Sequence, residues 1–410
     1  MLTDLRTAPR EDTTLRCLWL TWTDPQPEHD GQRIYSGRLI DALAGAGAAV
    51  DVLCFASEGS RRRYGTVEGR VAWWPAPRAS RPGWASLFSS LPNLAYRSES
   101  KALRQTIRQA AVERLWDAVV LDGLGAGWAL PLLAPLRGPG GCRPQVVYVA
   151  HNHEESTRAR VAVDYRGSPF VKTALRLDSF KVRRLEQRMV DRADLITAIT
   201  PEDAERFIEG RPDKRIIVLP PGYAGQRIPR RLITADHPRR AVVVGSFDWV
   251  AKRMNLERFL TVADPLFGAS KTELHVVGNG APEFMEQLRR RFPATRFVGA
   301  VPAIEPHLAE ARIAVVPELT GGGFKLKVLD YVFNRLPIAA IDGSVTGVPL
   351  RAPESLLSFK SLEDLACGVV AAIDDLPLLN RLQDRAFAAC ANQFEWQTRG
   401  EWLLTHTACP

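Results

Sequence analysis

The chain has 410 residues, of which 46% are hydrophobic and 24% charged, and its formal net charge is +8. This length exceeds what one hydrophobic core usually supports, so we expect two globular domains, and the composition excludes a disordered or fibrous protein. The modest basic excess suits phosphate-bearing ligands or an anionic membrane surface, whereas nucleic acid would require a dense basic stripe with aromatic residues, which the sequence lacks.

The N-terminal segment 1–16 mixes charges and has no apolar core, which argues against a signal peptide. The longest uncharged apolar run, Gly123 to Leu136, is too short to cross a bilayer and contains two prolines. We therefore expect a cytoplasmic protein. Six cysteines without a C-x-x-C spacing are expected to be reduced and structural.

The first half of the chain alternates short apolar runs with helical patterns, which is typical of a parallel sheet built from βα units. The expected strands are 15–22, 49–55, 118–121, 146–150, 195–199 and 216–219. The expected helices are 33–44, 178–193 and one opened by Thr200 and Pro201, a favourable N-cap with proline at the first helical position.

A polar run at 223–240, preceded by Pro220-Pro221-Gly222, predicts a linker. The alternation then restarts, with strands expected at 241–244, 273–277, 296–298, 313–316 and 338–341 and helices at 256–267, 282–291, 304–310 and 327–333. We therefore predict an α/β protein of two Rossmann-like domains, residues 1–222 and 241–390. Ligands should bind between them, beyond the carboxyl ends of both sheets.

The most informative segment is Pro317–Ala340, in which a strand ends, three consecutive glycines follow and a helix begins near Lys327. Glycines let the backbone approach a ligand, and a helix N-terminus attracts anions. Lys325 and Lys327 are two of only nine lysines and stand at that N-terminus, where a cation opposes the helix dipole unless an anion joins it. The segment predicts a diphosphate site, and a surface turn with solvated lysines is the alternative.

Two further positions suit a bound nucleotide sugar. Asp330 lies one turn after Lys327, where its carboxylate could accept from ribose hydroxyls, although an acid placed favourably at a helix start is the alternative. His151 ends a strand and leads into the polar residues 152–155, where a neutral imidazole could bond a sugar hydroxyl or stabilise developing charge. A capping turn, or a metal site using both histidines and Glu154, are the alternatives there.

These residues resemble the donor-binding signature of the retaining family-four glycosyltransferases, in which Glu-Gly-Phe, five residues and a second Glu open a helix. Gly323-Phe324 match the Gly-Phe, Asp330 stands for the second Glu, Leu336-Pro337 match the turn into the next strand, and Gly322 holds the place of the first Glu. The resemblance implies a GT-B fold, in which two Rossmann-like domains with parallel sheets face a central cleft. It also implies that residues 391–410 form a helix crossing back to the first domain.

The resemblance assigns donor contacts to glycine loops and cations along the chain, and some GT-B members use a lysine at the place of Lys327 for the diphosphate. The donor-binding candidates are Gly31, Gly245, Lys252, Arg253, Gly278, Val298, Gly322, Gly323, Phe324, Lys325, Leu326, Lys327 and Asp330. The candidates for catalysis are His151, Lys327 and Glu154. The turn at 278–280 does not extend to G-x-G-x-x-G, which argues against a dinucleotide cofactor.

The leading hypothesis is a glycosyltransferase that moves a sugar from a nucleoside diphosphate to a glycan, lipid-linked or small-molecule acceptor, without a metal or other cofactor. Retention is preferred, because the departing phosphate can then take the acceptor proton, whereas inversion needs a general base such as Glu154, Glu155 or Asp122. A nucleotide-sugar 2-epimerase of the same fold and a non-catalytic two-lobed binding protein are the alternatives.

Residues 82–108 combine Trp84, Leu87 and Phe88 with several cations, which suits peripheral contact with the inner face of an anionic membrane. Ordinary core helices with solvated charges are the alternative.

Overall fold

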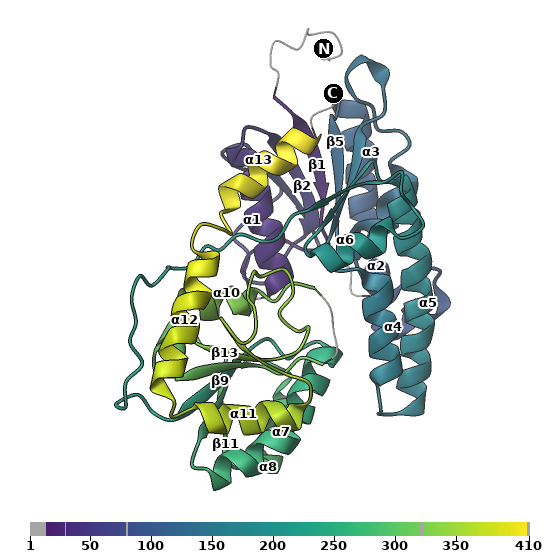
Figure 1. Ribbon diagram of the computed structural model, residues 1–410. Helices are drawn as coiled ribbons and strands as arrows, with labels where there is room; N and C mark the ends of the chain where they lie inside the picture. The colour runs from purple at the N-terminus through teal and green to yellow at the C-terminus, as the bar shows by residue number, and fades with distance from the viewer. Residues whose placement is uncertain (1–13, 29, 79–80, 320–322, 408–410) are drawn as a thin grey trace.

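The computed structural model describes residues 14–28, 30–78, 81–319 and 323–407 and forms two α/β domains (Figure 1). Gly322 of the predicted donor loop lies outside the described residues. The N-terminal domain holds an eight-stranded sheet of order β3-β4-β2-β1-β5-β6-β7-β8, in which β3 pairs antiparallel with β4 and the other neighbours pair in parallel. The C-terminal domain holds a six-stranded parallel sheet of order β11-β10-β9-β12-β13-β14.

The strands of the first sheet are β1 (Arg16–Leu20), β2 (Ala49–Phe55), β3 (Thr66–Glu68), β4 (Val71–Ala76), β5 (Ala118–Asp122), β6 (Gln145–Ala150), β7 (Leu195–Ala198) and β8 (Arg215–Val218). The helices of this domain are α1 (Gly31–Gly45), α2 (Asn93–Arg97), α3 (Lys101–Glu113), α4 (Glu154–Asp164), α5 (Pro169–Arg192) and α6 (Pro201–Ile208). Three 3₁₀ helices accompany them, η1 (Gly83–Phe88), η2 (Leu124–Leu132) and η3 (Pro139–Gly141).

The strands of the second sheet are β9 (Arg240–Val244), β10 (Glu273–Val277), β11 (Thr295–Gly299), β12 (Ile313–Val316), β13 (Ile338–Ile341) and β14 (Leu357–Phe359). The helices are α7 (Val250–Ala269), α8 (Pro282–Arg291), α9 (Glu305–Ala309), α10 (Leu326–Phe333), α11 (Leu362–Ala372), α12 (Leu376–Cys390) and α13 (Trp396–Thr407).

Each sheet is buried on both faces, which explains why its central strands are continuous apolar runs. In the N-terminal domain one face packs against α1 and α13, and the other packs against α3, α5 and η2. In the C-terminal domain α7, α8 and α11 cover one face, and α10 and α12 cover the other. The predicted architecture of two domains with parallel sheets is confirmed.

The strand orders place the ligand-binding edge of each domain. From β1 the chain moves to β2 on one side and later to β5 on the other, and from β9 it moves to β10 and later to β12 in the same way. Loops at the carboxyl ends of such neighbouring strands diverge and leave room for a ligand. The segments that follow β1, β5, β9 and β12 are therefore the expected sites of binding.

The last helix, α13, connects the two domains. It follows α12 and lies on α1 of the N-terminal domain, as the yellow end of the chain in Figure 1 shows. A Cβ atom at Gly400 of α13 would lie 2.0 Å from the carbonyl oxygen of Ala42, so the two helix backbones are in contact. Trp396 packs against Gly222 and Tyr35 at the same junction.

The structure corrects the starts of three predicted helices. α1 begins at Gly31 because Asp30 caps it, its side chain accepting from the backbone N–H of Arg33. α7 begins at Val250 rather than 256. α5 begins at Pro169 rather than 178. The first turns were missed because their apolar residues are exposed and show no core-facing periodicity. The strands β3, β4 and β14 and the helices α2, α3 and α4 were not predicted.

The five described cysteines are free thiols, and Cys142 and Cys367 among them are exposed. No helix among the described residues is both long and apolar enough to cross a membrane.

Candidate functional site

The segment between β12 and α10 contacts the N-terminal domain at Gly323. This residue has φ +75°, and a Cβ atom there would lie 2.0 Å from Oδ1 of Asn152 and 3.2 Å from the carbonyl oxygen of His151. A side chain at position 323 is therefore opposed both by the backbone conformation and by the neighbouring domain. The bend places the start of α10 against the carboxyl end of β6.

The first turns of α10 and α1 meet across the same boundary. Gly31 is the first residue of α1, and a Cβ atom there would lie 3.3 Å from Cδ1 of Leu326, the first residue of α10. The N-cap position of α10 is held by Lys325, whose side chain makes no capping hydrogen bond. The N-terminal backbone N–H groups of α10 thus lack a side-chain cap, and such groups favour an anion.

Three lysines and one glutamate gather at this helix start. Lys327 forms an ion pair with Glu318, and their side chains are 14% and 16% exposed. Burial, followed by the charge of Lys327, lowers the pKa of Lys252 on α7, and burial also lowers the pKa of Lys325, whose cationic neighbours include Lys327. Cations gathered this closely attract an anion. The structure therefore brings together three of the predicted phosphate-binding cations.

Glu318 was not predicted as part of the site. Glu318 comes directly after Pro317, two residues beyond the end of β12. A charged residue just beyond the carboxyl end of a buried strand is a signal that sequence reasoning could have used. Burial works to raise the pKa of Glu318, but Lys327 and Lys325 outweigh burial and the net shift is downward. One carboxylate oxygen, Oε1, pairs with Lys327, whereas the buried Oε2 has no hydrogen-bond partner in the described part of the chain.

His151 is held from one side by a buried carboxylate. Its Nε2 lies 2.6 Å from Oδ1 of Asp122, and Oδ2 of Asp122 accepts from Nε1 of Trp19 at 2.9 Å. With Nε2–H donating to Asp122, Nδ1 is the hydrogen-bond acceptor of the imidazole. Gly123 has φ +76° and allows this approach, because a Cβ atom there would lie 2.9 Å from Cδ2 of His151. Asp122 therefore orients the imidazole.

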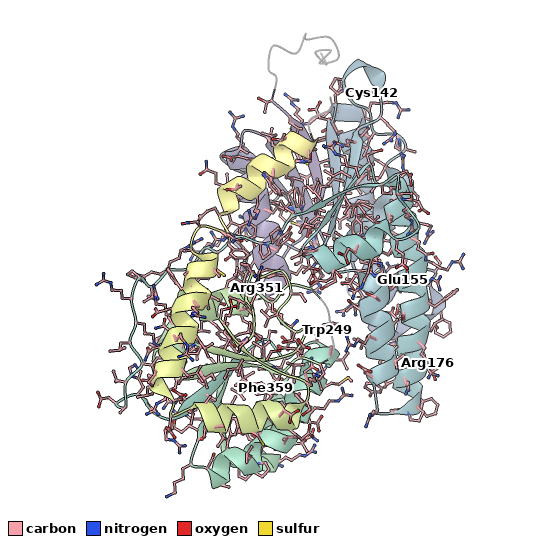
Figure 2. All side chains as sticks on the ribbon, in the orientation of Figure 1. Cys142, Glu155, Arg176, Trp249, Arg351 and Phe359 are labelled. Atoms are coloured by element: carbon pink, nitrogen blue, oxygen red, sulfur yellow. The ribbon has the colours of Figure 1, made fainter. Side chains whose placement is uncertain are left out.

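Glu154 begins α4 and is tightly paired. Its carboxylate accepts from Nδ2 of Asn152 at 3.0 Å and from Nε of Arg158 at 2.9 Å. Burial works to raise its pKa, but Arg158 outweighs burial and the net shift is downward. The guanidinium of Arg158 also lies 5.6 Å from the ring centre of Trp249, which Figure 2 labels on the side of the C-terminal domain that faces α4. A carboxylate held in this way is a weak base, so the geometry does not favour Glu154 as general base.

A second buried carboxylate, Glu186 on α5, caps the start of α4. It accepts from the backbone N–H groups of Glu154 at 3.0 Å and Glu155 at 2.6 Å, and from the hydroxyl of Tyr148 at 3.0 Å. Burial, followed by the charge of Glu154, raises the pKa of Glu186 to about 8. The carboxyl group of Glu186 therefore supports the 151–155 segment from behind.

His153, in the same segment, is the N-cap of α4, and its Nδ1 accepts from the backbone N–H of Ser156 at 3.3 Å. Within the described residues no group of three or more His, Cys, Asp and Glu side chains is arranged to hold a metal ion. For His153 the geometry thus favours the capping turn.

Asp330 lies on α10 beside Tyr223 of the interdomain segment. Burial, followed by the charge of Glu305, raises the pKa of Asp330 to about 7, and a hydrogen bond with Tyr223 works in the opposite direction. A carboxyl group with this pKa titrates at physiological pH. It can accept from a vicinal diol when ionised and donate to one when protonated.

The other predicted donor residues of the C-terminal domain lie in two glycine turns, on β11 and on α7. A Cβ atom at Gly278, which has φ +135°, would lie 1.7 Å from the carbonyl oxygen of Gly245, so these two turns are in contact. Val298 is half-buried on β11 and packs against the core. Arg253 bonds its own segment instead, donating to the carbonyl oxygen of Asp248 at 3.1 Å.

Phe324 packs against the cores of both domains, with its ring 5.9 Å from that of Phe394 and its side chain against Gly347. Its contacts are those of a residue that fixes the 323–327 segment between the domains.

Comparisons with known proteins identify both domains. Residues 30–222 match the family model described as Glycosyl transferase 4-like domain, and residues 238–375 match the one described as Glycosyl transferases group 1. No curated protein matches the chain.

Several solved structures share its fold. Sucrose-phosphate synthase from Thermosynechococcus elongatus is 15% identical over 96% of this chain and 98% of that chain, with a TM-score of 0.70. WaaG, a glycosyltransferase involved in lipopolysaccharide biosynthesis, is 15% identical over 96% of this chain and 100% of that chain, with a TM-score of 0.66. Anabaena HepE in complex with UDP and glucose is 13% identical over 96% of this chain and 99% of that chain, with a TM-score of 0.61.

Proposed function

Because the chain is a glycosyltransferase of the GT-B fold, with a 4-like domain followed by a group 1 domain, we propose that its donor is a nucleoside diphosphate sugar. The acceptor is a glycan, a lipid-linked molecule or a small molecule, and the transferred group is of the hexosyl type. HepE, which has the same fold, was crystallised with UDP-glucose, and this supports a donor of that class.

The observation that carries the proposal is the cluster of three lysines at the start of α10. Lys327, Lys325 and Lys252 lie beside a helix N-terminus without a side-chain cap, and the only one of them in an ion pair among the described residues is Lys327, which pairs with Glu318. A diphosphate can pair with these cations and accept from the backbone N–H groups. These lysines stabilise the charge that develops on the departing diphosphate, which is the role a metal ion has in other transferases, so we propose transfer without a metal cofactor.

His151 and Asp330 would then hold the two ends of the donor. Asp330 binds the ribose hydroxyls one turn along α10 from the diphosphate. His151 lies beyond Gly323 on the opposite domain, and its Nδ1 accepts from a hydroxyl of the transferred sugar. The turns at Gly245 and Gly278 and the residue Val298 line the side of the nucleotide.

We further propose that the configuration of the sugar is retained. The candidate carboxylate bases on the N-terminal domain are already engaged, since Glu154 pairs with Arg158, Glu155 pairs with Arg183 and Asp122 pairs with His151. The departing phosphate oxygen can accept the acceptor proton on the same face as the bond that breaks.

Nucleotide-dependent thermal shift tests this site. One of UDP, GDP, ADP and TDP should raise the midpoint of unfolding by several degrees, because a ligand at 100 times its Kd adds about 2.7 kcal/mol of stability. Lys327→Ala should abolish the shift, and Lys360→Ala, an exposed lysine elsewhere in the domain, should not. No response to any of the four nucleotides would refute the donor site. Product analysis then separates transfer to an acceptor from 2-epimerisation of the donor.

We also propose that the enzyme works at the inner face of an anionic membrane. Exposed aromatic side chains on the N-terminal domain support this, among them Phe88 and Phe170.

A further inference from the structure

Large hydrophobic side chains gather on η1 and the first half of α5. Seven that are at least 39% exposed lie there, namely Trp84, Leu87, Phe88, Phe170, Val171, Leu177 and Phe180. Lys181 of α5 joins the two elements, its Nζ donating to the carbonyl oxygens of Ser86 at 2.8 Å and Leu87 at 3.0 Å. The residues of η1 and of the first half of α5 together form the α5 face, and concentrated exposure of this kind marks an interaction site.

The same face of α5 becomes basic towards its C-terminal end. Residues three, four and seven positions apart lie on one side of a helix. On this side Phe170 and Leu177 are followed by Lys181, Arg184, Arg188 and Arg192. Figure 1 shows α5 as a long helix at the outer side of the N-terminal domain, and Figure 2 labels Arg176 on its lower half. The helix thus presents apolar and cationic halves in succession.

A cavity of about 540 Å³ opens beside the basic half. Three arginines line it, Arg104, Arg188 and Arg192, together with apolar residues that include Trp128. Its carboxylate, Glu99, is already paired with Arg104 and Arg81. Within the described part of the chain neither Arg188 nor Arg192 forms an ion pair. Arginine at such a place suits a phosphate, which it binds through two parallel N–H groups.

We infer that the α5 face binds the surface of an anionic lipid bilayer, with the aromatic residues of η1 and α5 in the interfacial layer and a lipid headgroup phosphate in the arginine-lined cavity. Charge complementarity selects this occupant, because the face combines exposed aromatic rings with Arg188 and Arg192, which form no ion pair among the described residues. The inference refines the proposed work at a membrane. It is independent of the donor site, which lies on the opposite side of α4.

Vesicle flotation of the full chain tests the inference. The protein should float with vesicles of phosphatidylcholine and phosphatidylglycerol and stay behind with phosphatidylcholine alone. Arg188→Glu/Arg192→Glu should weaken partitioning by about 30-fold or more, because two cations near an anionic surface contribute about that factor to the binding constant. The matched control is Arg381→Glu/Arg385→Glu on α12, which changes the same charge at the same i, i+4 spacing on exposed residues of the other domain. It should retain partitioning within about threefold, as expected of charges away from the bilayer.

The apolar half is tested separately with Trp84→Ala/Phe88→Ala and a control at the exposed Trp402 of α13. The first variant should lose most of its flotation and Trp402→Ala should lose none. Excess glycerol 3-phosphate should release little wild-type protein, and full release would assign the cavity to a free phosphate ester and overturn the inference. Equal loss in the two double-arginine variants, or a dimer in sedimentation that Trp84→Ala/Phe88→Ala dissociates, would also overturn it. Nucleotide thermal shifts on the same variants should be unchanged, so a failure of the α5 face is distinguishable from a failure of the donor site.

Discussion

Glu318→Gln removes the carboxylate that pairs with Lys327 and nearly preserves the shape of the side chain. If Lys327 is the counter-ion of a diphosphate, Glu318 and the incoming phosphate compete for it. Two oxygens bound to one ammonium group lie roughly 4.5 Å apart, and at an effective dielectric constant of about 20 two unit charges at that distance repel by about 4 kcal/mol. Solvent screening reduces this figure, so we expect Glu318→Gln to bind UDP roughly 10- to 100-fold more tightly.

The same substitution should destabilise the free protein. Loss of one partner from a fully buried ion pair costs roughly 3–5 kcal/mol, and an exposed pair contributes at most about 1 kcal/mol. The side chains of Lys327 and Glu318 are 14% and 16% exposed, so we expect about 2 kcal/mol, between those limits. The variant should thus show a lower unfolding midpoint without nucleotide and a larger shift with it.

Isothermal titration calorimetry with UDP at two salt concentrations, together with chemical denaturation, measures both effects. Glu310→Gln is the control, because Glu310 pairs with Arg240 in the same domain and its side chain is 63% exposed. It should leave UDP affinity unchanged. Unchanged or weaker UDP binding by a folded Glu318→Gln protein would refute the assignment of Lys327 to the diphosphate.

The imidazole and two carboxyl groups of the site can each be tested by one substitution. His151→Gln, which keeps a donor for Asp122, should lower kcat by roughly 10- to 100-fold while the Kd of UDP changes little, because the imidazole faces the sugar and not the nucleotide; a matching loss of UDP affinity would contradict this. Asp330 has a pKa of about 7, and its ionisation makes it a better acceptor from the ribose hydroxyls. The UDP affinity of the wild-type protein should therefore rise several-fold more between pH 6 and pH 8 than that of Asp330→Asn. Parallel pH profiles of the two proteins would exclude this role. The pKa of Glu186 is raised to about 8, so the folded state binds the proton more tightly than the unfolded state and stability should fall by a few kcal/mol as pH rises from about 4.5 to 8; denaturation curves of Glu186→Gln should lack that slope, and an unchanged slope would contradict the assignment.

Local patterns predicted the fold well where strands are buried on both faces. The strands β2, β10, β12 and β13 begin and end at the predicted residues, because a short apolar run bounded by glycine or polar residues has few other interpretations. Helix starts were less predictable. The first turns of α5 form no part of the core, so Phe170 and Leu177 produce no core-facing period, although Pro169 at the first position was an available signal.

The candidate site was predictable in its local part and not in its tertiary part. Glycines between a strand and a helix, followed by lysine, identify the β12–α10 segment without any knowledge of the rest of the chain. Asp122 and His151 are 29 residues apart, and only the pairing of β5 with β6 brings them together. The interpretation of Glu154 as a base overlooked Arg158, one helical turn later on the same face, which was a readable signal for an i, i+4 ion pair.

Gly323→Ala and Gly343→Ala together test whether the domains meet at the donor segment in solution. Gly323 and Gly343 both have positive φ, +75° and +69°, but a Cβ atom at Gly323 would strike Asn152 of the N-terminal domain, and one at Gly343 would meet open space. Substitution by alanine should therefore cost each variant a similar backbone strain of about 1 kcal/mol, and only Gly323→Ala should also push α10 away from β6. We expect Gly343→Ala to keep its UDP affinity and its transfer rate. The transfer rate of Gly323→Ala should fall by at least tenfold. The unfolding free energies of the two variants should agree within about 1 kcal/mol. Equal activity of the two variants would mean that the bend at Gly323 does not press on Asn152 during turnover. The lysines and His151 would then act on the donor from domains that are farther apart than in this structure.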